Sequence, residues 1–428
     1  MLTQKQCNRE RIVNFAKDTV WVMKIKTLYI KNIGPFREAT LEFSTQQNKE
    51  TGEEPVTIIT GRNGAGKSII IDAIRAALIG TGIERNIVAN DDDFKIEMSL
   101  NYDGAFVTKA TDKFSNGNIN GIDWNALGQY FHQGYKLPGK VYDWVVDYWS
   151  SKLPTDSFNL NTMNGIKNEL VLAGVLNGKK TNVELTNFIC QIDYLRTSEM
   201  PKEKNVGEVM YKKLKEIVNL SLEMGEFKYV RRSDLTPIIQ QNGVDLSLEK
   251  LSSGNIFLIE HLVMLMCKMY SVAMLNNIPA EKMFDISGLL LADEVENHMH
   301  PLWQKKILGI IRSLFPNIQI ILTTHSPFVV SSMDGARIYT CVPQTGYSEV
   351  RDETDKYSHM PVEEILQSDV FSVNPFNEEI ACLMAKRKDL IDKGKIAEGR
   401  QVGKQLYDIN PEYFSYMNPE VGKIGGEQ

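Results

Sequence analysis

A glycine-rich segment of eight residues carries the clearest chemical signal in the sequence. It runs from Gly61 to Ser68 as GRNGAGKS and fits the pattern GxxxxGK followed by Ser or Thr. Glycines let backbone N–H groups approach phosphate oxygens, and a helix that begins after the loop adds favourable partial charge. Lys67 is expected to reach the β- and γ-phosphates of a nucleotide, whereas Ser68 is expected to ligate Mg²⁺. The predicted nucleotide contacts are Arg62, Asn63, Gly64, Ala65, Gly66, Lys67 and Ser68.

Two carboxylates follow an apolar run much later in the chain. Asp293 and Glu294 come directly after LLLA, an apolar run that is typical of a buried strand. Ligands of α/β proteins usually bind at the edge of the sheet where such strands end. Asp293 is suited to the magnesium shell, and Glu294 to positioning or activating the attacking water. Acidic pairs at strand ends also occur as helix caps, so the phosphate-binding loop upstream is what favours the chemical interpretation.

A single histidine follows the next apolar run. His325 stands in TTHSP after the strand-like segment 318–322, so it should emerge at the same sheet edge and contact a γ-phosphate. Glu296, His298 and His300 alternate acid and imidazole as zinc ligands often do. The HExxH spacing is absent, however, and Pro301 is a natural first residue of a helix. A structured loop beside the nucleotide is therefore favoured over a zinc site.

The elements that must position these residues form an α/β pattern. An apolar strand over 56–59, the glycine-rich loop and a helix over 68–78 follow one another directly. Strands over 288–292 and 318–322 flank a helix over about 301–315, which predicts a βαβ unit with parallel pairing. We expect an N-terminal extension (1–22), a first lobe (23–115), a mostly helical insertion (116–235), a second lobe (236–360) and a C-terminal tail (361–428) that forms a helical hairpin.

The composition is that of an ordinary soluble protein. The 428 residues are 43% hydrophobic and 24% charged, and the net charge of −6 argues against a uniformly basic nucleic-acid coat. Five widely spaced cysteines without a CxxC predict neither a disulfide framework nor a zinc site, which fits a reducing cytoplasm. No apolar stretch is expected to approach the roughly 20 residues that span a bilayer, so no membrane association is predicted.

The order of these motifs resembles the ABC-type ATPase heads of the RecF, SMC and OLD class. In that class an LSGGQ-like signature follows an insertion and precedes the acidic strand. The matching residues are Leu251, Ser252, Ser253 and Gly254. The resemblance implies an α/β head with a mixed and parallel sheet, a Walker A loop at 61–68 and ATP with Mg²⁺ as ligands. It also implies a homodimer or higher homo-oligomer, in which the signature of one copy caps the γ-phosphate that Lys67 of another copy holds.

Two positions match that family pattern less well. Asn255 replaces the glutamine or glutamate that usually follows the signature. Gln133 is a candidate for the ATP-contacting glutamine of the family's Q-loop, but Gln129 competes with it because the surrounding residues are not distinctive.

The segment DEVENHMHP, from Asp293 to Pro301, resembles the form found in stand-alone bacterial ATPases, including those of Septu, PARIS and OLD-like phage defence. The segment 363–371 resembles the end of the Septu and PARIS ATPases. No DxD motif follows His325, and His359 is the one histidine after it, so neither a TOPRIM nor an HNH nuclease is expected in this chain. The resemblance implies a sensor or scaffold that controls a separately encoded effector, such as an HNH or TOPRIM nuclease or a toxin.

A DNA-repair or DNA-maintenance ATPase of RecF or SMC type that binds duplex DNA directly is the alternative. The candidate basic surface consists of Lys202, Lys204, Lys212, Lys213, Lys215, Lys228, Arg231 and Arg232. A solvated helical face explains the same residues equally well. An ATPase subunit of a transporter has no support in the sequence.

Overall fold

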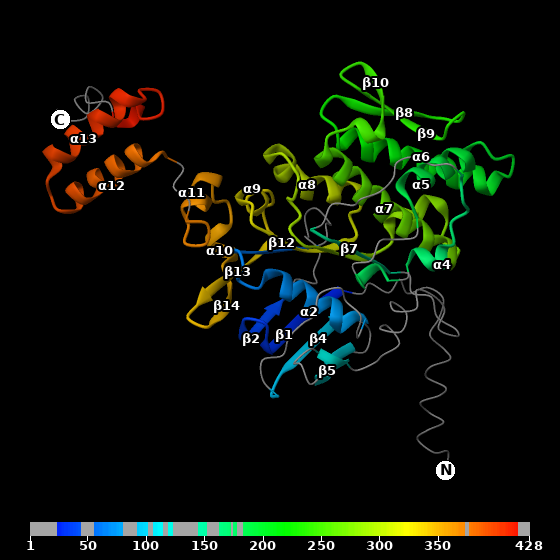
Figure 1. Ribbon diagram of the computed structural model, residues 1–428, viewed down its shortest axis with the longest axis horizontal. Helices are drawn as coiled ribbons and strands as arrows, with labels where there is room; N and C mark the ends of the chain where they lie inside the picture. Colours follow the sequence, from blue (N-terminus) through cyan, green and yellow to red (C-terminus); the bar gives the residue numbers. More distant parts are fainter. Residues whose placement is uncertain are drawn as a thin grey trace, which may run out of the picture. The chain divides into compact units, whose positions relative to one another are not determined.

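The computed structural model describes ten stretches of the chain. These are residues 24–43, 55–79, 92–101, 106–113, 119–122, 144–151, 162–172, 174–177, 183–372 and 376–417. The chain divides into two compact units, and the division lies between Met360 and Pro361. The first unit contains the sheet and the helices that pack on it, and the second is helical (Figure 1).

An 11-stranded mixed sheet organises the first unit, with the order β6-β5-β4-β1-β2-β14-β13-β3-β12-β11-β7. Its strands are β1 (Lys24–Ile33), β2 (Phe36–Glu42), β3 (Val56–Gly61), β4 (Lys95–Asn101), β5 (Phe106–Lys113), β6 (Ile119–Ile122), β7 (Val145–Trp149), β11 (Gly288–Ala292), β12 (Ile318–Thr324), β13 (Arg337–Gln344) and β14 (Tyr347–Asp352). The α/β fold class that the sequence predicts is thereby confirmed.

The parallel strands form the half of the sheet that matters for the site. β12 pairs in parallel with β11 on one side and with β3 on the other, and β3 pairs in parallel with β13. Every residue of β3, β11 and β12 is buried, as expected for apolar strands covered on both faces. α8 (Pro301–Leu314) connects β11 to β12, so the predicted βαβ unit is confirmed.

The antiparallel half is built from hairpins. β1 pairs with both β2 and β4, and β4 pairs with β5. β1 turns into β2 at Gly34, whose φ of +53° lies in the left-handed region that glycine adopts without steric cost. This turn lies beside the glycine-rich loop, so the antiparallel half also shapes the site.

The insertion expected over 116–235 is largely helical and also contains strands. It contains α4 (Asn168–Val171), α5 (Leu185–Arg196) and α6 (Pro201–Leu220), but β7 within it is a strand of the main sheet, parallel to β11. β7 has only five residues, of which Val145, Val146, Asp147 and Trp149 are buried. A strand buried on both faces shows no polar and apolar alternation, so its sequence could not be distinguished from a short helical segment.

A small second sheet was also missed. β8 (Gly225–Arg231), β9 (Thr236–Gln241) and β10 (Val244–Ser247) form a three-stranded antiparallel sheet in the order β10-β9-β8. Phe227 on β8 is buried and packs edge-on against Tyr211 of α6, with ring centroids 5.6 Å apart. The sheet therefore packs on the helical part of the insertion and begins inside the range expected to be helical.

The longest helix, α7 (Ser253–Asn276), corrects the expectation that no apolar stretch approaches membrane-spanning length. It has 24 residues and is long and apolar enough to cross a bilayer by length and composition. In the structure, 83% of the most apolar 18-residue stretch of this helix is buried inside the protein. Ser252 caps its first turn, and Asn277, with a φ of +55°, ends it. α7 is thus a largely buried helix of the first unit.

The remaining described elements complete the two units. In the first unit they are α2 (Lys67–Ile79), α9 (Pro327–Val330), α10 (Thr354–Tyr357), η1 (Val175–Asn177), η2 (Leu248–Lys250) and η3 (Ala280–Asp285); in the second they are α11 (Val362–Gln367), α12 (Glu378–Asp392), α13 (Ile396–Ile409) and η4 (Ser415–Met417). α12 and α13 form the predicted helical hairpin, and Gly394, with a φ of +74°, makes the turn between them.

A buried ion pair fastens α7 to β7. Lys268 is 6% exposed and its ammonium contacts the Asp147 carboxylate, which is 1% exposed. The same carboxylate accepts hydrogen bonds from the backbone N–H of Tyr148 at 2.7 Å and from Trp149 Nε1 at 3.1 Å. Every charge in this cluster has a partner, so removal of one partner leaves the other charge buried and uncompensated.

We therefore expect Lys268→Met to destabilise the fold by about 3–5 kcal/mol. Chemical denaturation followed by circular dichroism measures the change. Lys228→Met is the matched control, because Lys228 forms a solvent-exposed pair with Glu226 on β8 and should change stability little. Equal stabilities of the two variants would show that the buried pair does not hold α7 in place.

Candidate functional site

The glycine-rich loop connects β3 to α2 and is closely packed. Its three glycines all have positive φ, +148° at Gly61, +75° at Gly64 and +100° at Gly66. A Cβ added to Gly66 would lie 2.6 Å from both Pro35 Cγ and Phe36 Cζ of the β1–β2 turn. Only glycine therefore allows the loop to take this path against its neighbour.

Lys67 is the first residue of α2 and its ammonium points back into the loop. Its Nζ donates hydrogen bonds to the carbonyl oxygens of Gly61 at 3.0 Å and Arg62 at 3.1 Å. Burial lowers the pKa of Lys67, although nearby acidic groups, including Glu294 and Asp293, act in the opposite direction. A cation held beneath a loop of backbone N–H groups suits the binding of phosphate oxygens.

Asp293 meets Ser68 at the end of β11. Ser68 Oγ donates a hydrogen bond to Asp293 Oδ1 at 2.7 Å, although 225 positions separate the two residues. Thr323 Oγ1 donates to the same oxygen, also at 2.7 Å. A hydroxyl and a buried carboxylate in contact are oxygen ligands of the type that Mg²⁺ takes, so the residues fit the cation that the sequence implies.

Glu294 and His325 face each other across the same edge. His325 Nε2 lies 2.8 Å from Glu294 Oε1, so the ring donates when Nε2 carries the proton. Asn297 Nδ2 donates to the other oxygen of Glu294 at 3.0 Å. Burial acts to raise the pKa of Glu294, but the hydrogen bonds from His325 and Asn297 outweigh it and leave the pKa below its ordinary value. The side chain is therefore an ionised acceptor, as required to orient a water molecule.

These groups surround one cavity of about 510 Å³. Its lining residues are Pro35, Asn63, Gly64, Gly66, Lys67, Ser68, Ile69, Glu294 and His325. The structure thus brings together residues from the first loop, the acidic strand and the histidine strand. Arg62 and Ala65 belong to the same loop without lining the cavity, and Asp293 lies behind Ser68.

The predicted signature lies at the N-terminus of α7. Ser252 caps the helix by accepting a hydrogen bond from the backbone N–H of Asn255, and Asn255 Nδ2 donates to Ser221 O at 2.6 Å. Leu251 is buried, whereas Ser252 and Ser253 are exposed. A Cβ on Gly254 would lie 2.6 Å from His298 O, so this turn packs tightly against the loop after β11. None of the four signature residues lines the 510 Å³ cavity of the same chain.

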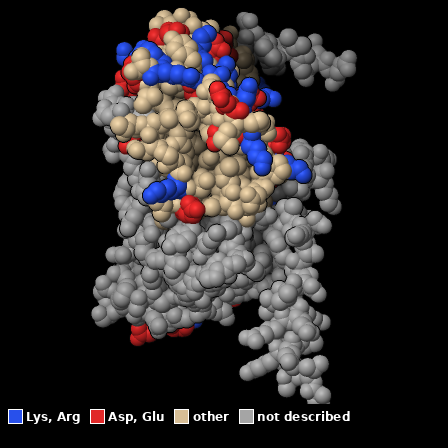
Figure 2. All heavy atoms as spheres, turned by 90° about the vertical axis from the view of Figure 1, so that its right-hand side faces the viewer, with Lys and Arg blue, Asp and Glu red and all other residues tan. Residues whose placement is uncertain are grey.

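The candidate basic surface on α6 and β8 is a surface of mixed charge. Lys213 pairs with Glu216, and Lys228 pairs with Glu226. In the same way, Arg231 pairs with Asp234, and Arg232 pairs with Asp193. Figure 2, which views the molecule from this side, shows basic and acidic residues interspersed. Such pairing reduces the positive potential that duplex DNA requires.

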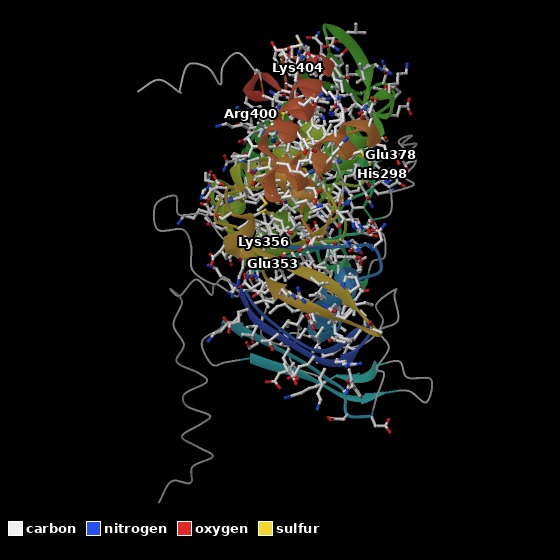
Figure 3. All side chains as sticks on the ribbon, turned by 90° about the vertical axis from the view of Figure 1, so that its left-hand side faces the viewer. His298, Glu353, Lys356, Glu378, Arg400 and Lys404 are labelled. Atoms are coloured by element: carbon white, nitrogen blue, oxygen red, sulfur yellow. The ribbon has the colours of Figure 1, made fainter. Side chains whose placement is uncertain are left out.

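The three residues considered for zinc have separate roles. Glu296 accepts hydrogen bonds from Thr324 Oγ1 at 2.7 Å and from the backbone N–H of His325, while burial raises the pKa of its carboxyl. His300 Nδ1 accepts from the backbone N–H of Leu302 at 3.3 Å and caps α8. His298, labelled in Figure 3, has a φ of +63° and its ring lies 6.5 Å from that of Phe257. The segment is a structured loop.

Sequence reasoning missed Thr323 and Asn297. Thr323 Oγ1 donates to Asp293 and also accepts from the backbone N–H of Glu294 at 2.8 Å. The sequence signal that could have identified Thr323 is its hydroxyl in the last two residues of β12, the strand next to the acidic strand β11. Asn297 follows Glu294 by three residues, a spacing that lets its amide reach back. Gln133 and its competitor Gln129 lie outside the described residues, so that contact stays a prediction.

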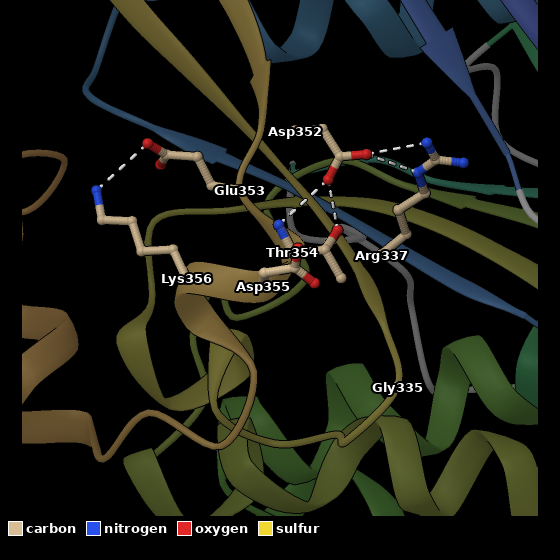
Figure 4. A pocket seen from close by; sticks show the side chains of 7 residues that line it. All are labelled: Gly335, Arg337, Asp352, Glu353, Thr354, Asp355 and Lys356. Atoms are coloured by element: carbon tan, nitrogen blue, oxygen red, sulfur yellow. Dashed lines mark hydrogen bonds and ion pairs between the residues drawn. The ribbon is translucent and has the colours of Figure 1, made fainter.

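A second cavity, of about 630 Å³, lies between β13, the end of β14 and α10 (Figure 4). Four of its five charged side chains form ion pairs with one another. Arg337 contacts Asp352 at 2.9 Å, and Lys356 contacts Glu353 at 3.3 Å. Thr354 Oγ1 donates to Asp352 Oδ1 at 2.6 Å. The cavity shares no lining residue with the first, and its lining carries three acidic and two basic side chains.

Two stretches of the chain match known protein families. Residues 27–127 match the model of a family described as "AAA domain", and residues 224–331 match one described as "AAA domain, putative AbiEii toxin, Type IV TA system". The two matches contain the glycine-rich loop and the acidic strand respectively. They are therefore consistent with a nucleotide site built from both halves of the chain.

Three curated relatives are similar to this chain. The "Retron Ec83 probable ATPase" of Escherichia coli is 22% identical over 90% of this chain and 83% of its own length. The "Retron Vc95 probable ATPase" of Vibrio cholerae serotype O1 biovar El Tor is 23% identical over 96% of this chain and 90% of its own length. The Septu protein PtuA of Bacillus thuringiensis is 35% identical over 25% of this chain and 26% of its own length. The resemblance to Septu ATPases that the motifs indicate is confirmed, whereas that to PARIS stays a prediction.

Among solved structures, the SMC head domain from Thermotoga maritima covers 77% of this chain and 98% of its own length. Its TM-score is 0.44 and its sequence identity is 18%.

The contrast between two glycines of the loop gives a test of its packing. We expect Gly66→Ala to destabilise the protein more than Gly64→Ala, because nothing lies within 4 Å of a Cβ on Gly64. Both substitutions strain a positive φ, but only the first adds a steric clash worth about 1–3 kcal/mol. Thermal unfolding of both variants measures the difference. Equal midpoints would mean that the β1–β2 turn does not constrain the loop.

Proposed function

We propose that this chain is an ABC-type ATPase that binds ATP with Mg²⁺ and hydrolyses it at sites completed by a second copy. The single observation that carries the proposal is the convergence at one cavity. The cavity is lined by Lys67 and Ser68 from one loop and by Glu294 and His325 from two neighbouring strands, with Asp293 against Ser68. The two AAA-domain matches and the retron ATPases support the same activity.

The residues have distinct roles in this proposal. The loop N–H groups and Lys67 bind the β- and γ-phosphates, and Ser68 and Asp293 hold Mg²⁺. When bound, Mg²⁺ supplies a positive charge that neutralises phosphate oxygens. Glu294 orients and deprotonates the attacking water, since it is an ionised acceptor at the cavity wall. His325 hydrogen-bonds Glu294 and lines the cavity, where it contacts the γ-phosphate.

A second copy supplies the missing side of each site. The signature turn ends at an exposed helix N-terminus that carries Ser252 and Ser253, and it lies outside the cavity of its own chain. Exposed N–H groups and hydroxyls at such an end favour an anion. The γ-phosphate bound to another copy is the anion that fits, and the resulting assembly is a homodimer or a larger homo-oligomer.

The names of the relatives, which refer to retrons and to Septu, support a proposed cellular role. In this proposal the chain acts in the cytoplasm as the sensor or scaffold of an antiphage complex. Its nucleotide state would control a separately encoded nuclease or toxin, of HNH or TOPRIM type, by differential affinity for two assemblies. A nuclease activity of its own is not part of the proposal.

Glu294→Gln should preserve ATP binding and stop turnover, because the amide is isosteric but cannot accept the proton of water. Calorimetry measures the affinity, and steady-state phosphate release measures turnover. Lys67→Ala is the contrasting variant, which should lose ATP affinity itself. Unchanged phosphate release by Glu294→Gln would refute the role of Glu294, and intact affinity of Lys67→Ala would refute that of the loop.

Mixing two inactive variants tests the shared site. The negative charge of Ser253→Glu is favourable at the N-terminus of its own helix but repels a triphosphate. We therefore expect Ser253→Glu to be inactive alone, and Lys67→Ala likewise. In a mixed dimer, one site combines an intact Lys67 with an intact Ser253. Half of the dimers are mixed and one of their two sites is intact, so the mixture should regain about a quarter of wild-type turnover. A mixture as inactive as its components would place the signature in the site of its own chain.

A further inference from the structure

Glu296 joins the loop after β11 to the loop after β12. Its side chain is buried, and its two oxygens receive donors from the last residue of β12 and from the first residue after it. Thr324 Oγ1 donates to Oε2 at 2.7 Å, and the backbone N–H of His325 donates to Oε1. The carboxylate therefore fixes the main chain of His325, while the imidazole ring remains directed at Glu294.

A second set of hydrogen bonds continues from the same point. The backbone N–H of Ser326 donates to Thr324 Oγ1 at 2.9 Å, and Ser326 Oγ donates to Gln304 Oε1 at 2.6 Å. Gln304 Nε2 in turn donates to Met299 O at 2.8 Å. The chain of contacts leads back to the loop after β11, so the two loops are held together on both sides of His325.

These two sets of hydrogen bonds keep Glu294 and His325 in a fixed arrangement. Glu294 has a φ of +54°, a conformation that a non-glycine residue keeps only where its surroundings enforce it. The 2.8 Å contact between His325 Nε2 and Glu294 Oε1 also requires both loops to keep their relative position. A loss of about 1 Å in such alignment can reduce a rate by about 100-fold.

We propose that Glu296 is the positioning residue of His325, and that it acts by accepting the His325 backbone N–H and the Thr324 hydroxyl, without touching nucleotide itself. The inference rests on the proposed function, because it needs His325 to take part in ATP hydrolysis. Glu296 does not line the cavity, which separates its role from those of Glu294 and His325.

The test compares Glu296→Gln with Glu353→Gln. Glu353 is a matched control because its carboxylate also accepts a threonine hydroxyl, from Thr340 Oγ1 at 2.9 Å, yet it lies in the second cavity (Figure 4). We expect Glu296→Gln to lower kcat about 10-fold or more while KM stays within about twofold, and Glu353→Gln to leave both unchanged. Wild-type kcat in folded Glu296→Gln would overturn the proposal.

A double substitution decides whether Glu296 acts through His325. The variant Glu296→Gln/His325→Ala should turn over no more slowly than His325→Ala alone, since nothing remains to be positioned. Fully additive losses would contradict the proposal. If His325→Ala retains wild-type turnover while Glu294→Gln has none, the positioning proposal fails and the ATPase function stands. If neither substitution changes turnover, the proposed function fails as well.

A spectroscopic readout separates positioning from a general loss of structure. The chain has six histidines, and selective ¹⁵N-histidine labelling gives one backbone amide signal for each. The signal absent from His325→Ala belongs to His325, and it should shift in Glu296→Gln but not in Glu353→Gln. An unshifted signal would show that the carboxylate does not hold that N–H group.

A second pair of variants applies if Glu296→Gln does not fold. Thr324→Ser keeps the hydroxyl that Glu296 accepts, whereas Thr324→Val removes it. We expect Thr324→Ser to have nearly wild-type kcat and Thr324→Val to be slower. A folded Thr324→Val with wild-type kcat would count against the proposal.

Discussion

The register of the parallel strands β3, β12 and β11 is the constraint on which the site depends. Thr324 pairs with Thr60 across one boundary, and Leu322 pairs with Ala292 across the other. The three strands therefore end near one another at the same edge of the sheet, and the segments that follow them emerge side by side. Because the contact between Ser68 and Asp293 spans 225 positions at 2.7 Å, a slip of a single residue in this register would separate the two side chains.

Hydrogen bonds then fix what the register brings together. Thr323 contacts both Asp293 and the backbone of Glu294, and Glu296 accepts donors from Thr324 and His325. A buried carboxylate or hydroxyl without partners would be costly, so each of these contacts also satisfies a polar group in the core. The same bonds that make the edge stable therefore define the positions of the acidic and basic side chains at the cavity.

α7 links this edge to the interior of the first unit. Its N-terminal turn has no room for a Cβ at Gly254 against the loop after β11, and farther along it Lys268 pairs with Asp147 of β7. β7 in turn is fastened to the acidic strand, since the backbone N–H of Asp293 donates to Trp149 O at 2.9 Å. An anion bound at the start of α7 would thus act on a helix that is rigidly attached to the strands of the site.

The sequence alone determined the glycine-rich loop, the acidic strand and the βαβ unit, because each is encoded by neighbouring residues in one segment. It also indicated that residues 361–428 contain a helical hairpin. It could not reveal β7, which lacks alternation, or the burial of α7, whose composition also suits a membrane. Thr323, Asn297 and Glu296 gained their roles only from the tertiary structure, because a hydrogen bond depends on distances between loops that the order of residues does not contain.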